Sequence, residues 1–152
     1  MTETQNVTAI KTVQLQIPED LSRTYAVIKE LRPHLDLEEF TRLVQLARAG
    51  DGYRLVAREE RGKIIAVMGF RILHDLVHGS HLYIDDLVTT KDRRSEGHGA
   101  ELLRFAEGEA RRLGLTGLRL CTGVENEAGR KFYEREGWTA RALAFKKKVS
   151  NH

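Results

Sequence analysis

The spacing of apolar residues changes character along this chain. Apolar side chains three and four positions apart predict helices, and alternating ones predict strands. The pattern predicts a strand, two helices and three strands, followed by an alternation of helix and strand that ends on a strand. The expected ranges are 11–17, 18–32, 36–50, 53–59, 62–73, 81–90, 99–114, 115–123, 126–137 and 138–149. This order, β-α-α-β-β-β-α-β-α-β, indicates one α/β domain over residues 1–152, with residues 1–10 as a candidate disordered segment.

The first two helices have recognisable ends. Pro18 suits a helix start, and Pro33 disfavours helical backbone before it, so the first helix should end near residue 31 or 32. In the second helix Asp36 is a candidate N-cap, with Glu39 at the capping-box position and Gly50 as the expected stop.

Composition indicates a folded protein. Hydrophobic residues make up 41% of the 152 and charged residues 31%, which is typical of a packed domain. No apolar run approaches the ~20 residues that cross a bilayer, and the N-terminal residues lack the pattern of a secretory signal. The single cysteine, Cys121, excludes an internal disulfide and a cysteine-rich metal site, and its place within a predicted strand favours a small core residue. We therefore expect a cytoplasmic protein.

A loop with two glycines separates the strand at 81–90 from the next helix. Gly97 and Gly99 stand where that helix begins, and a helix N-terminus has unpaired N–H groups that suit an anion. Lys91, Arg93 and Arg94 add positive charge, so the loop is a candidate diphosphate site. A P-loop would need Lys and then Ser or Thr after Gly99, and a Rossmann fingerprint would need a third glycine at position 102. Both motifs fit poorly, and a plain strand-to-helix turn with basic surface residues is the alternative.

The segment RSEGHGAELL, residues 94–103, resembles the Q/R-x-x-G-x-G/A motif of the GNAT superfamily of N-acetyltransferases. In that family the motif binds the pyrophosphate of acetyl-coenzyme A (acetyl-CoA), and the preceding strand pairs with its pantetheine arm. The resemblance extends over nearly the whole chain. It implies a single GNAT-like α+β domain, with a mixed, mostly antiparallel sheet of about six to seven strands flanked by four helices. The coenzyme-binding residues that it implies here are Leu87, Val88, Thr89, Arg93, Arg94, Ser95, Glu96, Gly97, His98, Gly99 and Ala100.

The helix predicted at 126–137 has a polar face. Seven residues make close to two helical turns, so one side of this helix presents Asn126, Gly129, Arg130 and Tyr133. Two plainer interpretations stay open, because Asn126 is also a good N-cap and a tyrosine on a helix commonly serves packing. The segment NEAGRKFY is similar to the N-x-x-A/G-x-x-x-Y motif of GNAT enzymes. The resemblance implies that Tyr133 protonates the leaving thiolate as general acid, and that the whole face lies against the coenzyme.

Two adjacent acids open the segment DDLVTT. Amide formation from a thioester needs a neutral amine, so a group near the acetyl carbon has to accept a proton, directly or through water. Asp85 and Asp86 are neighbours on a strand and should face opposite sides of the sheet. We favour Asp86 as the general base, because it precedes Leu87 as an acid precedes Leu-x-Val in several GNAT relatives. Asp85 is the second choice.

Other roles for these acids stay open. They would also serve to cap the loop, to pair with an arginine, or to bind a cationic acceptor without proton transfer. The backbone N–H of Val88 is a candidate oxyanion donor, because the family's central strand bulges there.

Acceptor residues are expected in the first two helices and in the loops beside the central strand, where the resemblance places acceptor specificity. The expected acceptor is a primary amine of a small molecule or protein, which attacks acetyl-CoA directly. Three histidines lie between two strands, but no acid or cysteine set completes a metal site, so we expect no metal. The acceptor candidates are Phe40, Arg42, Tyr53, His74, His78 and His81.

Two other functions are alternatives to catalysis. A domain that senses acyl-CoA without turnover would share the coenzyme site, but it would not need Asp86 and Tyr133. A nucleic-acid-binding protein is disfavoured, because the net charge is only +3 and no stripe of aromatic and basic residues occurs. We also expect no membrane partner, and the resemblance makes a homodimer a candidate assembly.

Overall fold

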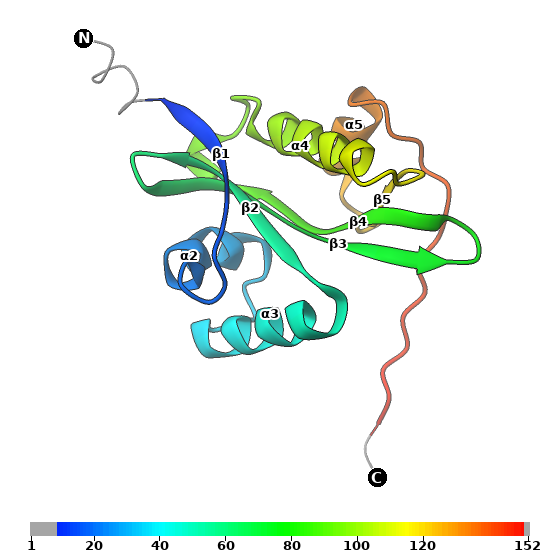
Figure 1. The fold of residues 1–152 in the computed structure, drawn as a ribbon, viewed down its shortest axis with the longest axis horizontal. Helices are drawn as coiled ribbons and strands as arrows, with labels where there is room; N and C mark the ends of the chain where they lie inside the picture. Colours follow the sequence, from blue (N-terminus) through cyan, green and yellow to red (C-terminus); the bar gives the residue numbers. More distant parts are fainter. Residues whose placement is uncertain (1–8, 151–152) are drawn as a thin grey trace. The chain divides into compact units, whose positions relative to one another are not determined.

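The computed structural model describes residues 9–150 in two compact units, one ending at Leu120 and one beginning at Cys121 (Figure 1). The first unit contains a five-stranded sheet with the strands in sequence order. The first three pairings are antiparallel, and the last, between β4 and β5, is parallel. The predicted mixed, mostly antiparallel sheet is therefore confirmed. Its strands are β1 (Ile10–Gln14), β2 (Arg54–Glu60), β3 (Lys63–Asp75), β4 (Gly79–Thr89) and β5 (Leu118–Leu120).

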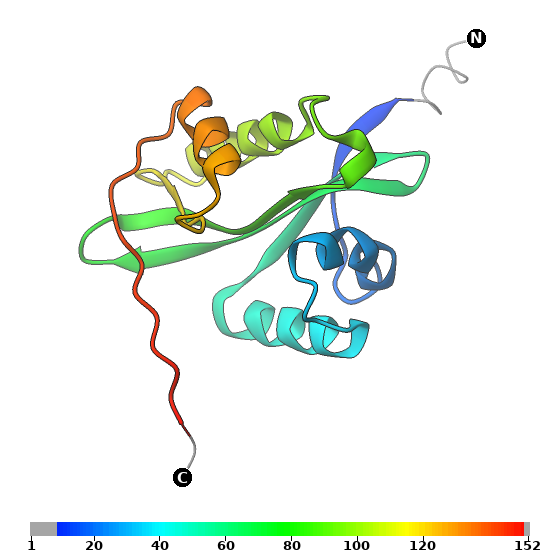
Figure 2. The same cartoon turned by 180° about the vertical axis from the view of Figure 1, so that it is seen from behind.

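Helices cover both faces of this sheet. α2 (Leu21–Leu31) and α3 (Leu37–Asp51) lie against one face, and α4 (His98–Arg112) lies against the other (Figure 1 and Figure 2). A short 3-10 helix, η1 (Lys91–Arg93), precedes α4. The two helices expected before the main strands and the helix expected after them are all present.

Each face has its own apolar contacts. On the α2–α3 face the side chains of Val27 and Phe40 belong to one buried cluster with Leu55 of the sheet. On the opposite face the Phe70 ring contacts the Phe105 ring of α4, with 6.3 Å between centroids. The sheet is therefore the shared middle layer of two apolar cores.

The ends of α3 follow the local sequence signals in part. The Asp36 carboxylate accepts a hydrogen bond from the Glu39 N–H at 2.8 Å, which confirms the predicted cap. Gly50 is the predicted stop, but the helix continues to Asp51. Gly52 has the left-handed backbone that ends the helix, with φ of 68°, and glycine adopts that conformation without a Cβ clash.

A bulge interrupts the pairing of β3 with β4. Gly69 is opposite Asp86, and the next residue, Phe70, is opposite Ile84. Asp85 is therefore an extra residue on β4 without its own partner on β3, which defines a β-bulge.

The bulge changes the phase of the side chains along β4. Ile84 is opposite Phe70, on the face covered by α4, whereas Val88 is opposite Val67 in the cluster with α2 and α3. In a regular strand Ile84 and Val88 would share a face. Asp86, two residues before Val88, lies on the α2–α3 face as a result.

The second unit contains one helix among its described residues, α5 (Glu127–Arg135), which brings the helices to the expected four. The strand predicted at 138–149 is wrong. That segment has no regular secondary structure, and its Leu143 and Phe145 side chains are exposed. A strand needs a neighbouring edge for its backbone hydrogen bonds, and no strand within residues 121–150 offers one. The described chain thus has five strands, not six to seven.

Two further expectations are corrected at the ends of strands. Cys121 is exposed rather than in the core, because β5 already ends at Leu120. In the candidate disordered segment 1–10, Ile10 begins β1, while residues 1–8 lie outside the described residues.

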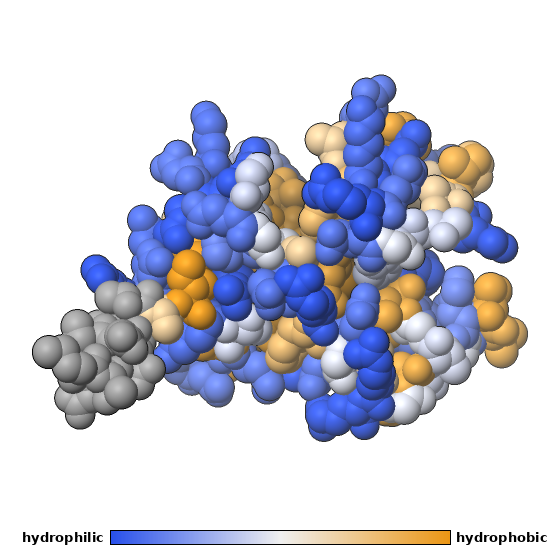
Figure 3. All heavy atoms as spheres, turned by 90° about the horizontal axis from the view of Figure 1, so that it is seen from above, coloured by the Kyte–Doolittle hydropathy of each residue, from blue (hydrophilic) through white to orange (hydrophobic). Residues whose placement is uncertain are grey.

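The surface is largely polar on the face drawn in Figure 3, where apolar side chains form small patches among charged ones. Within the part of the chain that the structure describes, no helix has both the length and the apolar character needed to cross a membrane.

Candidate active site

The Asp86 carboxylate is held by two donors from distant parts of the first unit. Arg32, directly after α2, donates from Nε to Oδ1 at 3.0 Å; its Nη2 lies 2.9 Å from the same oxygen and donates to the Asp85 carbonyl at 3.0 Å. The Tyr53 hydroxyl, directly before β2, donates to Oδ2 at 2.5 Å. The Asp86 side chain keeps 18% of its surface exposed. The carboxylate is therefore oriented by protein groups and still reachable from solvent.

Tyr53 stays a hydrogen-bond donor at any ordinary pH. Its side chain is buried, and burial together with the negative charge of Asp86 raises the pKa of the phenol well above 10. Its ring packs directly on Gly69 of β3, the residue opposite Asp86. A Cβ at position 69 would lie 1.7 Å from the Tyr53 hydroxyl oxygen, so only glycine leaves room for the ring.

Asp85 has a different partner. Arg71 of β3 donates to both of its carboxylate oxygens at 2.9–3.1 Å, and it also donates to Asp51, the last residue of α3, at 2.9 Å. Burial raises the pKa of the Asp85 carboxyl, and the Arg71 guanidinium opposes that shift. The alternative that the acids pair with an arginine therefore holds for both, Asp86 with Arg32 and Asp85 with Arg71.

The expectation that the two acids face opposite sides of the sheet is wrong. Asp86 binds Arg32 and Tyr53, and Asp85 is linked through Arg71 to α3, so both carboxylates lie toward the α2–α3 face. The bulge is the physical reason, because an extra residue breaks the alternation on which the expectation rested. The structure places this bulge at Asp85, and not at Val88 as expected.

One edge of β4 is paired only in part. β5 pairs with Leu82–Ile84, and no strand among residues 9–150 pairs with that edge at Asp85–Thr89. The other edge of this segment pairs with β3. No strand of the described chain pairs with the backbone groups on this edge, so they suit an extended ligand with amide groups, although the Asp85 and Thr89 carbonyls at its ends accept from Arg32 at 3.0 Å and from Arg94 at 3.3 Å.

The glycine loop leads into the N-terminus of α4. Gly97 is the N-cap residue with φ of 86°, and Ser95 also has a positive φ of 66°. No side chain caps this helix, so the N–H groups of its first turn are available to an anion. Gly99 and Ala100 lie within that turn. The geometry suits the predicted diphosphate site.

Side chains of the loop differ in how far they are engaged. Arg93 donates to Glu60 at 3.0 Å and to Glu96 at 3.0 Å, and the buried His98 lies 3.0 Å from the same Glu96 oxygen. Arg93, Glu96 and His98 are predicted coenzyme ligands, and here they stabilise the loop by contacts with one another. Arg94 is exposed, and its Nε donates weakly to the Thr89 carbonyl at 3.3 Å, so its charge is available to a ligand.

In the second unit, Asn126 caps α5. Its Oδ1 accepts from the Gly129 N–H at 3.0 Å, and its Nδ2 donates to Thr122 Oγ1 at 2.9 Å. A Cβ at position 129 would lie 2.2 Å from Asn126 Nδ2, so the cap side chain fills the space that the glycine leaves. The alternative interpretation of Asn126 as an N-cap is therefore confirmed. The exposed Arg130 lies on the same helix.

Tyr133 lies between two aromatic rings of its own unit. Its ring centroid is 5.2 Å from that of Phe132 and 6.1 Å from that of Trp138. Burial raises the pKa of its hydroxyl above 10. The hydroxyl is thus protonated near neutral pH, as a general acid has to be.

Comparison with known proteins decides the family. The Acetyltransferase (GNAT) family model matches residues 15–138. The chain belongs to this family. It is an N-acetyltransferase that uses acetyl-CoA and acts on an amine, as the motifs around Gly97 and Tyr133 implied.

Relatives match over most of their length. The chain is 34% identical over 137 residues to the uncharacterized N-acetyltransferase YhdJ of Bacillus subtilis, covering 90% of this chain and 96% of that protein. It is 30% identical over 133 residues to the aminoalkylphosphonate N-acetyltransferase of Salmonella typhimurium, covering 85% of each. The aminoglycoside N-acetyltransferase AAC(6')-Iy, solved in complex with CoA, shares the fold with a TM-score of 0.80 at 17% identity, over 93% of this chain and 97% of that one.

The predicted acceptor residues of this GNAT enzyme are scattered. Phe40 is only 4% exposed and its ring packs on Tyr25, so it is a core residue. Arg42 pairs with Glu39 on the exposed side of α3, and the His74 ring lies 2.7 Å from a serine hydroxyl of β4. Only Tyr53 contacts an acid of the candidate active site.

His78 and His81 have an acid beside them after all. Asp75 joins them at the β3–β4 hairpin, and donor atoms of the three residues lie within 4.8 Å of one another. However, Arg119 donates to Nε2 of the buried His81 at 3.3 Å and lies 3.9 Å from Asp75. That positive charge opposes the binding of a metal cation.

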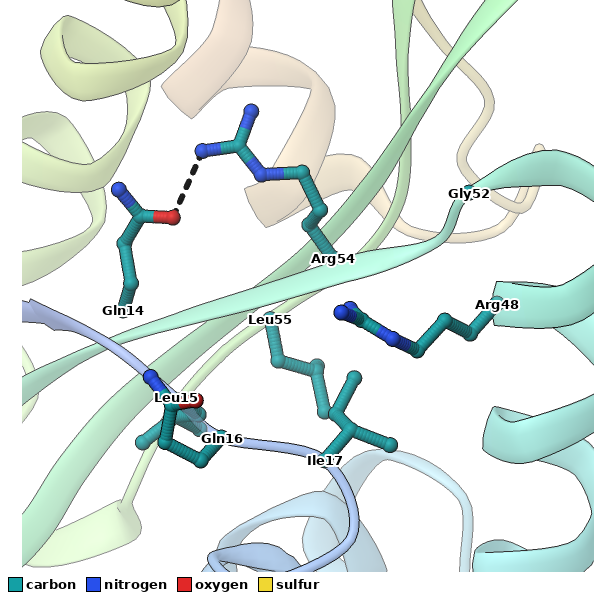
Figure 4. A pocket seen from close by; sticks show the side chains of 8 residues that line it. All are labelled: Gln14, Leu15, Gln16, Ile17, Arg48, Gly52, Arg54 and Leu55. Atoms are coloured by element: carbon teal, nitrogen blue, oxygen red, sulfur yellow. Dashed lines mark hydrogen bonds between the residues drawn. The ribbon is translucent and has the colours of Figure 1, made fainter.

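A hollow of about 410 Å³ lies elsewhere in the GNAT enzyme, between β1, the end of α3 and the start of β2 (Figure 4). In that view Arg48 reaches toward Ile17 and Leu55. Arg54 is bound to Gln14 at 2.8 Å. None of the predicted site residues lines this hollow, and no acid among its lining residues suits proton transfer.

Sequence patterns missed the residues that organise Asp86. Arg32 ends a helix and Gly69 lies within a strand, and neither belongs to a recognisable motif. Tyr53 was a candidate only as an acceptor contact. These three lie 17 to 54 positions from Asp86 in the sequence, so only the folded sheet brings them together.

Proposed function

We propose that this N-acetyltransferase transfers the acetyl group directly to a primary amine, with Asp86 as general base and Tyr133 as general acid. The observation that carries the proposal is the Asp86 carboxylate, oriented by Arg32 and Tyr53 yet partly exposed. It directly precedes the Leu87–Thr89 segment, whose edge is free for the pantetheine arm. Asp85 is the weaker candidate, because a guanidinium, that of Arg71, binds both of its oxygens, whereas Arg32 binds only Oδ1 of Asp86 and Oδ2 has the neutral Tyr53 hydroxyl as its partner.

The reaction needs three proton transfers. The acceptor ammonium gives a proton to Asp86, directly or through water, and the free amine attacks the thioester carbonyl carbon. The nitrogen of the tetrahedral intermediate then carries a positive charge and releases its second proton to water. When the C–S bond breaks, the thiolate takes the Tyr133 proton and the N-acetyl product leaves. Both side chains then return to their starting protonation states by exchange with solvent.

The coenzyme would bind along the free edge of β4 and at the start of α4. Leu87–Thr89 would pair with the pantetheine amides, and the N–H groups from Gly97 to Ala100 would bind the diphosphate. Arg94 would add charge to the diphosphate, while Arg93, Glu96 and His98 keep the loop in shape. Arg130 and the Asn126–Tyr133 face of α5 would contact the coenzyme in the same complex.

The acceptor is proposed to be a small amine that also carries an anionic group. The Arg32 side chain is 40% exposed beside Asp86, so a cation lies next to the proposed base. An amine with a nearby acidic group would match this pair of charges. The relative from Salmonella, named for aminoalkylphosphonates, supports the same class.

Release of the CoA thiol with a panel of amines tests this proposal. The panel contains aminoalkylphosphonates and the matched alkylamines without the phosphonate. We expect acetyl-CoA to raise the melting temperature and the anionic amines to turn over faster. Asp86→Asn should lower kcat about 10²- to 10⁴-fold, and Tyr133→Phe should lower it by a factor of about 10 or more.

Three results would contradict parts of this proposal. Turnover that survives Asp86→Asn but not Asp85→Asn would reverse the assignment of the base. Unchanged kcat in Tyr133→Phe would remove the general acid. Stabilisation by acetyl-CoA without turnover of any amine would favour an acyl-CoA sensor.

A further inference from the structure

We propose that Tyr53 and Gly69 act together as a positioning device for Asp86: the tyrosine hydroxyl holds the carboxylate in one orientation toward the acceptor. The inference rests on the proposed role of Asp86 as general base and adds two residues that no motif assigns. Neither Tyr53 nor Gly69 would touch the reacting atoms, so both are positioning residues.

The steric fit between Gly69 and Tyr53 is close. Gly69 is buried on β3, opposite Asp86, and a Cβ there would meet the Tyr53 ring at 2.4 Å as well as its hydroxyl. Because the site is buried and the obstructing atoms belong to a rigid ring, the tyrosine would have to move. Gly69 therefore sets where the Tyr53 hydroxyl points.

The two donors on Asp86 differ in rigidity. Tyr53 is 6% exposed and belongs to the apolar cluster with α2 and α3, whereas the Arg32 side chain is 40% exposed. A buried tyrosine with two rotatable side-chain bonds keeps its place at low entropic cost. We therefore expect an incoming acceptor to be able to replace Arg32 as the partner of Asp86, while the hydrogen bond from Tyr53 is kept.

The local charges define what the tyrosine does. Two side chains contact the Asp86 carboxylate: Arg32, which follows α2, and Tyr53, which precedes β2. Asp85 is the preceding residue on β4, and its carboxylate is bound by Arg71. The Tyr53 hydroxyl is the donor to Oδ2, while Arg32 binds only Oδ1. Loss of that hydroxyl should therefore leave Oδ2 without its donor and let the carboxylate rotate away from the orientation that the acceptor needs.

The decisive variant is Tyr53→Phe, which removes one oxygen and keeps the ring. We expect kcat/KM at neutral pH to fall about tenfold. The loss should fall on kcat and leave KM for acetyl-CoA unchanged, because the hydroxyl orients the carboxylate and does not bind the coenzyme. Affinity for acetyl-CoA, measured by calorimetry, should stay the same. Gly69→Ala should also lower kcat, because it displaces the ring.

Two matched variants separate positioning from general packing. Tyr25→Phe removes another tyrosine hydroxyl of the same core, one that donates to the Leu35 carbonyl at 2.7 Å, and it should leave kcat unchanged. Gly108→Ala places a methyl group in open space on α4 and should leave activity unchanged.

A double-mutant cycle and a spectroscopic measurement complete the test. In an Asp86→Asn background, Tyr53→Phe should have no further effect on turnover. The ¹³C carboxyl signal of Asp86, recorded by NMR at neutral pH, should change its chemical shift in Tyr53→Phe whatever the catalytic role of Asp86, because the hydrogen bond to Oδ2 is lost. An unchanged chemical shift, or an activity loss equal to that of Tyr25→Phe, would overturn the positioning role. Full turnover in Asp86→Asn would instead overturn the proposed base and leave the NMR result standing.

Discussion

Glu30 of α2 binds Thr90 at the start of the glycine loop. Its Oε2 accepts a hydrogen bond from the Thr90 hydroxyl at 2.6 Å, and its Oε1 accepts one from the Lys91 N–H at 2.8 Å. One carboxylate thus fixes the point where β4 ends and the proposed diphosphate loop begins. The contact spans 60 positions of sequence.

Removing this contact should weaken coenzyme binding. Glu30→Ala deletes two hydrogen bonds that hold the loop, and we expect the Kd for acetyl-CoA to rise roughly fivefold. Calorimetric titration measures it. Glu38→Ala, an exposed acid of α3, is the matched control and should leave Kd unchanged. Equal affinities for the two variants would show that the loop needs no support from α2.

Arg94 should act on the diphosphate alone. Within residues 9–150 its exposed guanidinium makes one weak hydrogen bond, to the Thr89 carbonyl, so a diphosphate would be a stronger partner. We expect Arg94→Ala to bind acetyl-CoA about tenfold more weakly and to use acetyl-pantetheine, which has no diphosphate, as well as the wild type does. A similar loss with both donors would place Arg94 elsewhere in the site.

Gly129 should be needed for the cap of α5. A methyl group at this position would collide with the Asn126 amide, so Gly129→Ala should displace the cap. Loss of such a cap costs about 1 kcal/mol, and amide hydrogen exchange in the first turn of α5 should increase. In an Asn126→Ala background the glycine substitution should cost nothing more. Additive costs would mean that the collision is relieved in another way.

Glu109 should make stability depend on pH. Its buried carboxylate on α4 accepts from Arg54 at 2.7 Å and from Arg112 at 2.8 Å, and the hydrogen bonds from Arg112 and Arg54 lower its pKa from 4.5 to about 2. A lowered acid pKa stabilises the folded state above pH 4.5, and that contribution disappears as the pH falls from 4.5 toward 2.

Urea unfolding of Glu109→Gln tests this linkage. We expect a loss of about 1–3 kcal/mol at pH 7, and the gap from wild type should close across that acidic window. Glu107→Gln is the control, since its pair with Arg111 is exposed and 3.5 Å long. A gap that stays constant with pH would show that the loss is not electrostatic.

Local signals in the sequence predicted the parts of the fold that depend on neighbouring residues. The Asp36 cap, the antiparallel strands and the strand–loop–helix segment from Asp85 to Leu103 all follow from such signals. The prediction of a last strand at 138–149 is wrong because a strand depends on a partner segment elsewhere in the fold. Its alternation of apolar residues was present, but a strand also needs a partner edge, which periodicity does not report.

The sequence by itself determined which chemistry this protein carries. The glycines at 97 and 99, the asparagine–tyrosine spacing of 126 and 133, and an acid before Leu87 are all short-range features, and they were enough to indicate an acetyl-CoA-dependent N-acetyltransferase. The tertiary structure alone decided how Asp85 and Asp86 differ. A single extra residue in the β3–β4 pairing turns both acids toward the α2–α3 face. There Asp86 binds Arg32 and Asp85 binds Arg71, which lie in other segments of the chain. Strand register is a property of two paired segments, so one strand read alone cannot specify it.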